Sequence, residues 1–116
     1  MKINIRINER NLIATLNDNS SSKALIEKLE EGELTIKMQD YSNFEKVGNL
    51  GFNLPRNDEQ ISTDYGDLIL YQGSQFVIYY DKNNWNFTRL GKVDNISQDE
   101  LKEIIGDGNV IVTLSI

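Results

Sequence analysis

Residues 67–80, with the sequence Asp-Leu-Ile-Leu-Tyr-Gln-Gly-Ser-Gln-Phe-Val-Ile-Tyr-Tyr, decide the fold of this chain. Apolar residues, mostly β-branched and aromatic, form two continuous runs, Asp67–Gln72 and Gln75–Tyr80, on either side of a turn that contains Gly73. Two such runs around a short glycine-containing turn predict a β-hairpin. Because both runs are apolar on both faces, we expect these strands to be central and covered on the outside by a helix or loop.

Further strands are predicted on both sides of this hairpin. Apolar and polar residues alternate over residues 3–7, 12–16, 34–38 and 110–116, and residues 88–93 resemble another strand. The first two runs form an opening hairpin across the turn at residues 8–11. Between residues 40 and 64 the periodicity fails, and we expect an ordered, irregular excursion that packs on the body of the domain.

Two short helices complete the prediction. Helix-capping residue types at 17–21 precede apolar residues at helical spacing, and Gly32 ends this helix. Ser97 and Glu100 form a capping box at the start of the second helix, which Gly106 closes. Six or seven strands and two helices in 116 residues predict one mainly β domain, a β-barrel with helices at its ends.

The composition excludes several classes of function. The chain has no cysteine and no histidine, which excludes disulfides, thiol catalysis, cysteine-ligated zinc and histidine general bases. Its formal net charge of −6 argues against a nucleic-acid partner. No apolar run matches a signal peptide or a membrane span, so we expect a cytoplasmic protein without a membrane partner. Phosphate-loop and calcium-loop patterns are also missing, and we predict neither a cofactor nor a metal.

Four short motifs occur in order along the chain, at residues 38–47, 54–55, 66–68 and 89–93. Together with the opening hairpin and the terminal Val-Thr-Leu-Ser strand, they resemble the bacterial cyclophilin-like fold family over essentially the whole chain, residues 1–116. The resemblance implies a closed cyclophilin-like β-barrel of about eight strands with two short capping helices. A fold by itself carries no activity.

Cyclophilins isomerise prolyl bonds with an arginine in a Phe-His-Arg signature, which a chain without histidine lacks. No catalytic residue can therefore be assigned from the resemblance. Arg89, close after Trp85, is the best remaining hydrogen-bond donor, and the alternative is that it forms an internal salt bridge to Glu45 or Asp67. We expect the protein not to be an efficient prolyl isomerase.

The segment around residues 40–46, where a regular strand gives way to an irregular one, predicts a ligand-binding pocket at a barrel mouth. Aromatic side chains would make apolar contacts, and one carboxylate and one guanidinium would orient the ligand. The candidate ligand-binding residues are Tyr41, Phe44, Glu45, Leu50, Tyr71 and Arg89. The alternative is that Tyr41 and Phe44 are core anchors and that Glu45 and Lys46 form a solvated pair.

The orientation of three further aromatic residues stays open. Trp85 is either an exposed recognition residue or a core residue with its N–H bonded. Tyr79 and Tyr80 cannot both point into a barrel, because successive strand residues face opposite sides.

The predicted function is a non-catalytic module that binds a small molecule or an extended peptide. A second hypothesis is that the chain is an interaction partner of another protein. Cyclophilin-like proteins of this kind resemble proteins that are found near or beside flavodoxin-type redox proteins. Flavodoxins are acidic, so such an interface would need a local basic patch, for which Lys37, Lys46 and Arg56 are candidates. A divergent, weak prolyl isomerase is the third hypothesis.

Overall fold

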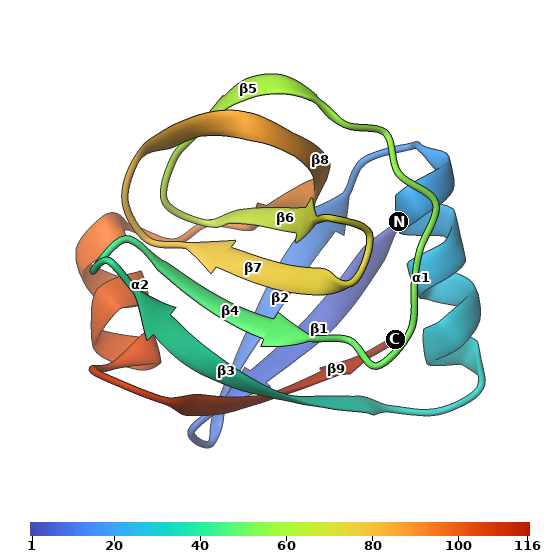
Figure 1. Ribbon diagram of the computed structural model, residues 1–116. Helices are drawn as coiled ribbons and strands as arrows, with labels where there is room; N and C mark the ends of the chain where they lie inside the picture. The colour runs from blue at the N-terminus through green and yellow to red at the C-terminus, as the bar shows by residue number, and fades with distance from the viewer.

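Eight antiparallel strands close into a barrel in the computed structural model, which describes residues 1–116 (Figure 1). The chain has nine strands, of which all but β5 form the barrel: β1 (Lys2–Ile7), β2 (Arg10–Leu16), β3 (Leu34–Tyr41), β4 (Glu45–Asn49), β5 (Glu59–Thr63), β6 (Asp67–Tyr71), β7 (Gln75–Tyr79), β8 (Asn83–Val93) and β9 (Val110–Ser115). Their order is β2-β1-β9-β3-β4-β7-β6-β8, and pairing of β2 with β8 closes the barrel. The predicted mainly β barrel with two helices is confirmed.

The longest strand, β8, belongs to two layers. Its second half pairs with β6 and β2 in the barrel wall, whereas residues 83–87 pair with β5 outside the barrel. We call β5 and this first half of β8 the outer ribbon. Gly91 lies where β8 meets β2, and a Cβ atom there would be 2.3 Å from the carbonyl oxygen of Thr15. Closure of the barrel therefore requires glycine at this position.

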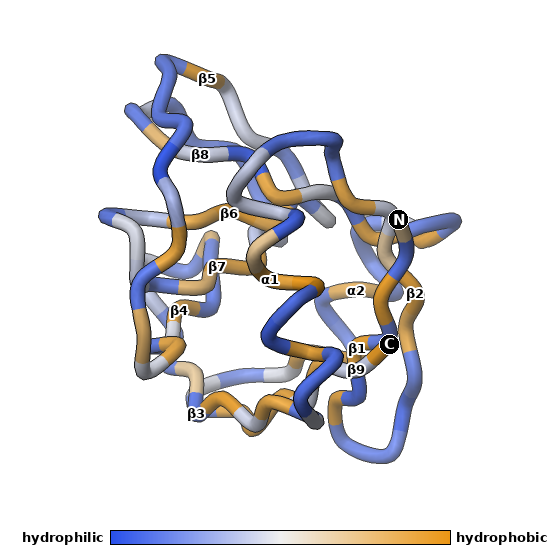
Figure 2. The backbone as a smooth tube through the Cα atoms, turned by 90° about the vertical axis from the view of Figure 1, so that its right-hand side faces the viewer, coloured by the Kyte–Doolittle hydropathy of each residue, from blue (hydrophilic) through white to orange (hydrophobic).

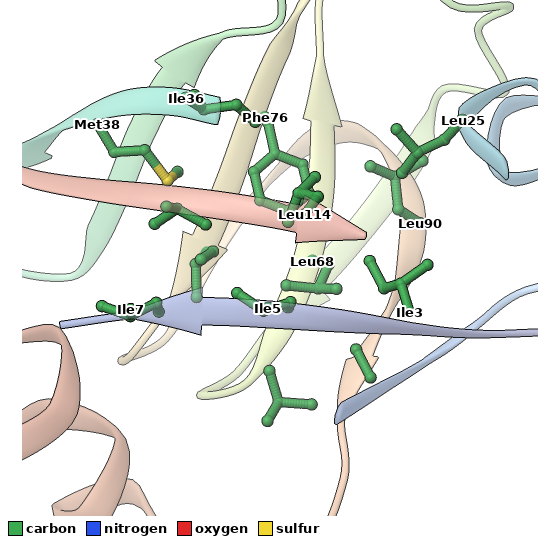
Figure 3. Packing of buried hydrophobic residues seen from close by; sticks show 14 of the residues in the cluster. Ile3, Ile5, Ile7, Leu25, Ile36, Met38, Leu68, Phe76, Leu90 and Leu114 are labelled. Carbon is green, nitrogen blue, oxygen red and sulfur yellow. The ribbon is translucent and has the colours of Figure 1, made fainter. Parts of the chain in front are cut away.

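The barrel interior holds the main hydrophobic core. Side chains from β1, β3, β6, β7, β8 and β9 meet there, including Ile5, Phe76 and Leu114 (Figure 3). A second, smaller cluster lies between the barrel wall and the outer ribbon, and we call it the outer cluster. Its buried members are Ile69, Val77, Tyr79 and Phe87, with Phe44, Val47, Ile61 and Tyr71 packed against them. The central hairpin β6–β7 is thus buried on both faces, as predicted, but its outer cover includes a strand.

The two helices lie at opposite ends of the barrel (Figure 1). Helix α1 (Ser20–Glu30) begins at Asn19, whose side chain accepts a hydrogen bond from the backbone of Ser22. In Figure 2, which looks onto this end, α1 crosses in front of the barrel. Helix α2 (Gln98–Ile105) has the predicted capping box between Ser97 and Glu100 and buries Leu101, Ile104 and Ile105. Capping and amphipathic spacing therefore identified both helices.

The segment 40–64 is more regular than predicted, because β4 and β5 lie within it. In β4, the interior-facing positions hold Lys46 and Gly48, so no apolar alternation marks the strand. A Cβ atom at Gly48 would lie 2.5 Å from Cγ2 of Ile36, which explains why a glycine faces the core. Strand β8 likewise begins at Asn83, five residues before the strand predicted at residues 88–93.

Candidate functional site

Five aromatic rings contact one another in series over the outer face of the barrel wall. Tyr41 meets Phe44 edge-on at 5.9 Å between ring centroids, and Phe44 stacks on Tyr79 at 5.9 Å. Tyr79 then meets Phe87, and Phe87 meets Tyr71, each at 5.8 Å. We call these five residues the aromatic row. Pairs at such distances add about 0.5–1.5 kcal/mol each beyond the area they bury, so the four contacts stabilise the row.

One end of the aromatic row is exposed, at the turn between β3 and β4 near α2 (Figure 1). Ser42 and Asn43 both have positive φ angles and turn the chain sharply there. The backbone carbonyl of Phe44 accepts hydrogen bonds from the amides of Tyr80 and Asp81, which fixes the turn against the end of β7. Tyr41 remains 58% exposed, so it is not the core anchor that the alternative interpretation required.

Glu45 lies beside this exposed end. It is opposite Tyr41 in the β3–β4 pair and opposite Tyr79 in the β4–β7 pair. Only 8% of Glu45 is exposed, and its carboxylate accepts a single long hydrogen bond, 3.4 Å, from the hydroxyl of Tyr79. Burial is the main cause that raises the pKa of Glu45 to about 7, and the nearby negative charge of Asp40 adds to it. No lysine or arginine forms an ion pair with this carboxylate.

Lys46 faces the opposite side of β4, since adjacent strand residues alternate. Its ammonium group is fully buried and donates hydrogen bonds to Asp40 at 3.1 Å and to the Gly108 carbonyl at 2.6 Å. The hydroxyl of Tyr80 also donates to Asp40. Burial alone would raise the pKa of Asp40, but the bonds from Tyr80 and Lys46 outweigh it and lower that pKa. This network connects β3, β4 and β7 to the loop after α2.

Two alternatives raised by the sequence are therefore wrong. Glu45 and Lys46 do not form a solvated pair, because they are buried on opposite faces of β4. Lys46 also cannot join Lys37 and Arg56 in a basic surface patch, since it is inside the barrel. Tyr79 and Tyr80 face opposite sides, as predicted: Tyr79 belongs to the outer cluster, and Tyr80 packs against the main core.

The remaining predicted site residues lie elsewhere. Leu50 comes directly after the last residue of β4, whereas Glu45 is the first residue of that strand, and Leu50 packs into the main core. Arg89 is opposite Ile69 of the outer cluster, but its guanidinium lies 3.1 Å from the Asp67 carboxylate, so the internal salt bridge is the interpretation that holds. Trp85 lies on the outer ribbon and is 59% exposed. Of the six candidates, the aromatic row contains Tyr41, Phe44 and Tyr71, and Glu45 borders it.

Two hollows on the surface lie away from these residues. One, of about 510 Å³, is open to solvent between the ends of β3 and β9 and the β1–β2 turn, and its walls include Lys37, Met38 and Ile111. The other, of about 180 Å³, lies after α1 beside Phe52. Neither hollow is lined by Glu45 or by a member of the aromatic row. We place the candidate site at the aromatic row, where ring contacts and a buried carboxylate coincide.

The closed barrel, the two end helices and the outer ribbon place the chain among mainly β proteins with an antiparallel β-barrel fold. The sequence matches the Cyclophilin-like family over residues 5–115, and the chain belongs to that family. No curated protein sequence matches the chain. Neither helix is long and apolar enough to cross a membrane.

Two solved structures share the fold. The solution structure of the hypothetical protein AF2241 from Archaeoglobus fulgidus is similar with a TM-score of 0.68 and 13% identity, over 97% of this chain and 92% of that one. The structure of McbB in complex with tryptophan is similar with a TM-score of 0.63 and 14% identity, over 97% of this chain but 44% of McbB. At these identities the similarity establishes the fold alone.

Proposed function

We propose that this protein is a binding module whose site is the exposed end of the aromatic row, and that its ligand is a small molecule or peptide segment with a flat apolar group. The observation that carries the proposal is the ring series that runs from the buried Tyr79 through Phe44 to the exposed Tyr41. Tyrosine held by packing supplies apolar contact area at a low entropic cost, which is why aromatic residues dominate binding hot spots.

Two further observations support this location. Glu45 supplies a polar group at the edge of the rings, so that apolar contact and orientation come from adjacent residues. McbB, a protein of similar fold, has been captured in complex with tryptophan, a small molecule with a flat aromatic group. The proposed site is on the outer face of the barrel at the α2 end, and it uses Tyr41, Phe44 and Glu45 among the candidates from the sequence.

Ligand-observed NMR with a set of aromatic fragments and aromatic dipeptides tests the proposal. We expect Tyr41→Ala to weaken the binding of the hits by roughly tenfold, the effect of truncating one hot-spot residue. Ile111→Ala is the matched control, because Ile111 on β9 is also 58% exposed but lies outside the aromatic row. Hits that bind Tyr41→Ala as tightly as the unmodified protein would contradict the proposed site.

A further inference from the structure

Three acidic residues with buried or mostly buried side chains differ in their partners: Asp40, Asp67 and Glu45. Asp67 is buried and lies within 3.1 Å of Arg89 and 4.0 Å of Lys92, and Asp40 accepts a hydrogen bond from Lys46. Glu45 is also buried, yet no cation lies within salt-bridge distance of it, and its one hydrogen bond is long. A buried carboxylate is normally paired, because leaving water without a partner is costly.

The groups around Glu45 do not supply the missing cation. From β7 the Tyr79 hydroxyl faces it, and that hydroxyl in turn accepts a hydrogen bond from the Asn83 side chain on β8. From β3 come the exposed Tyr41, directly opposite, and the negatively charged Asp40. The neighbouring Lys46 is engaged on the other face of the sheet. Glu45 therefore combines an acceptor-only carboxylate with surrounding aromatic rings.

We infer that the ligand carries a protonated amine next to its flat apolar group, and that the Glu45 carboxylate receives this amine while Tyr41 and Phe44 contact the apolar part. This inference rests on the proposed function and names the chemical class of its ligand. An ammonium group gains both a charge-assisted hydrogen bond from its N–H to the carboxylate and attraction to ring faces. The formal net charge of −6 favours the approach of a cation.

The pH dependence follows from the same contacts. An aliphatic amine with a pKa like that of lysine stays protonated throughout the neutral range, whereas a peptide α-amino group, with a pKa of about 7.7–8.0, is mostly protonated only up to about pH 7.5. Glu45 must be ionised to accept the ammonium group, and its pKa is raised to about 7 by burial, so binding of an amine should weaken as pH falls from 8 to 5.5. A neutral ligand should show no comparable dependence.

The amine can belong to a free small molecule or to a peptide N-terminus, and paired probes distinguish the two sources. Phenethylamine is compared with 2-phenylethanol, which has a hydroxyl in place of the amine. The tripeptide amide Phe-Gly-Gly-NH₂ is compared with its N-acetylated form. Binding to the full chain is measured by NMR titration at pH 8 and pH 5.5 for the phenethylamine pair. For the tripeptide pair the upper value is pH 7.5, where most of the α-amino group is still protonated. Glu45→Gln removes the charge at the site, and Glu59→Gln removes one exposed charge on β5 as the matched control.

At the higher pH of each pair, we expect at least one amine probe to bind roughly tenfold more tightly than its neutral partner, as a hydrogen bond to a charged group implies. Glu45→Gln or pH 5.5 should remove most of that preference, and Glu59→Gln should not. Equal affinities for amine and neutral probes, both weakened by Tyr41→Ala, would overturn the inference but leave the proposed function standing. If neither member of either pair binds, both are overturned.

Discussion

Replacing Glu45 with glutamine should stabilise this protein at neutral and alkaline pH. The carboxylate is buried beside Phe44 and Tyr79 without a cation, so the folded state favours its protonated form. Glutamine is nearly isosteric and stays neutral, so it avoids the cost of burying a charge. It also retains a side-chain oxygen that can accept the hydrogen bond from Tyr79.

The magnitude follows from the pKa of Glu45, which rises from an ordinary value of 4.5 to about 7 on folding. Between these two values the folded state holds a proton that the unfolded state has lost, so the free energy of unfolding falls as pH rises. Each pKa unit corresponds to about 1.4 kcal/mol. The advantage of Glu45→Gln over the unmodified protein should therefore grow by about 3 kcal/mol between pH 4 and pH 8.

Urea denaturation of the two proteins at several pH values between 4 and 8 measures this difference. Glu59→Gln, a change at an exposed position on β5, corrects for the general effect of removing one negative charge. The expected result is a gap between Glu45→Gln and the unmodified protein that widens with pH, together with a nearly constant gap for the control. If Glu45→Gln stabilises the protein no more at pH 8 than at pH 4, the Glu45 carboxylate does not have the raised pKa that its burial implies.

Three other variants test the barrel and its chemistry. Gly91→Ala should destabilise the protein by roughly 3 kcal/mol or prevent folding, because its Cβ atom would meet the backbone of β2; wild-type-like urea midpoints would contradict the close approach. Lys46→Met should cost about 3 kcal/mol in urea denaturation, since it leaves the Asp40 carboxylate without its cation, and adding Asp40→Asn should restore part of the loss. In a protease-coupled assay on an Ala-Pro-Phe peptide, we expect at most a few-fold acceleration, because Arg89 is paired with Asp67; a large acceleration that Arg89→Ala abolishes would identify an isomerase.

Most of the barrel could be predicted from the sequence, because its strands follow simple patterns. The hairpin at 67–80 and the alternating strands at both ends of the chain matched the structure, as did both helix caps. Strand β4 could not be found in this way, since its interior positions hold a lysine and a glycine. A lysine can occupy this interior position because its ammonium group donates hydrogen bonds to Asp40 and to the Gly108 carbonyl, and only the folded barrel brings these partners together.

The candidate site was predicted in part for a related reason. Tyr41, Phe44 and Glu45 are neighbours in sequence and stay together around a turn, so a local motif could identify them. Leu50 is near in sequence, but it comes at the other end of β4, where the chain enters the core. Tyr79 and Phe87 join the aromatic row through pairing of distant strands and through the outer ribbon, neither of which a sequence pattern reveals.

A ¹³C NMR titration of the Glu45 side-chain carboxyl, with and without millimolar phenethylamine, shows whether this carboxylate receives a cationic ligand. Burial of the carboxyl group predicts a midpoint near pH 7 in the free protein, and an ammonium group at the site should lower that midpoint clearly. A free-protein midpoint near the ordinary value of 4.5, or a midpoint near 7 that phenethylamine leaves unchanged, would contradict the proposal that Glu45 binds a cationic ligand.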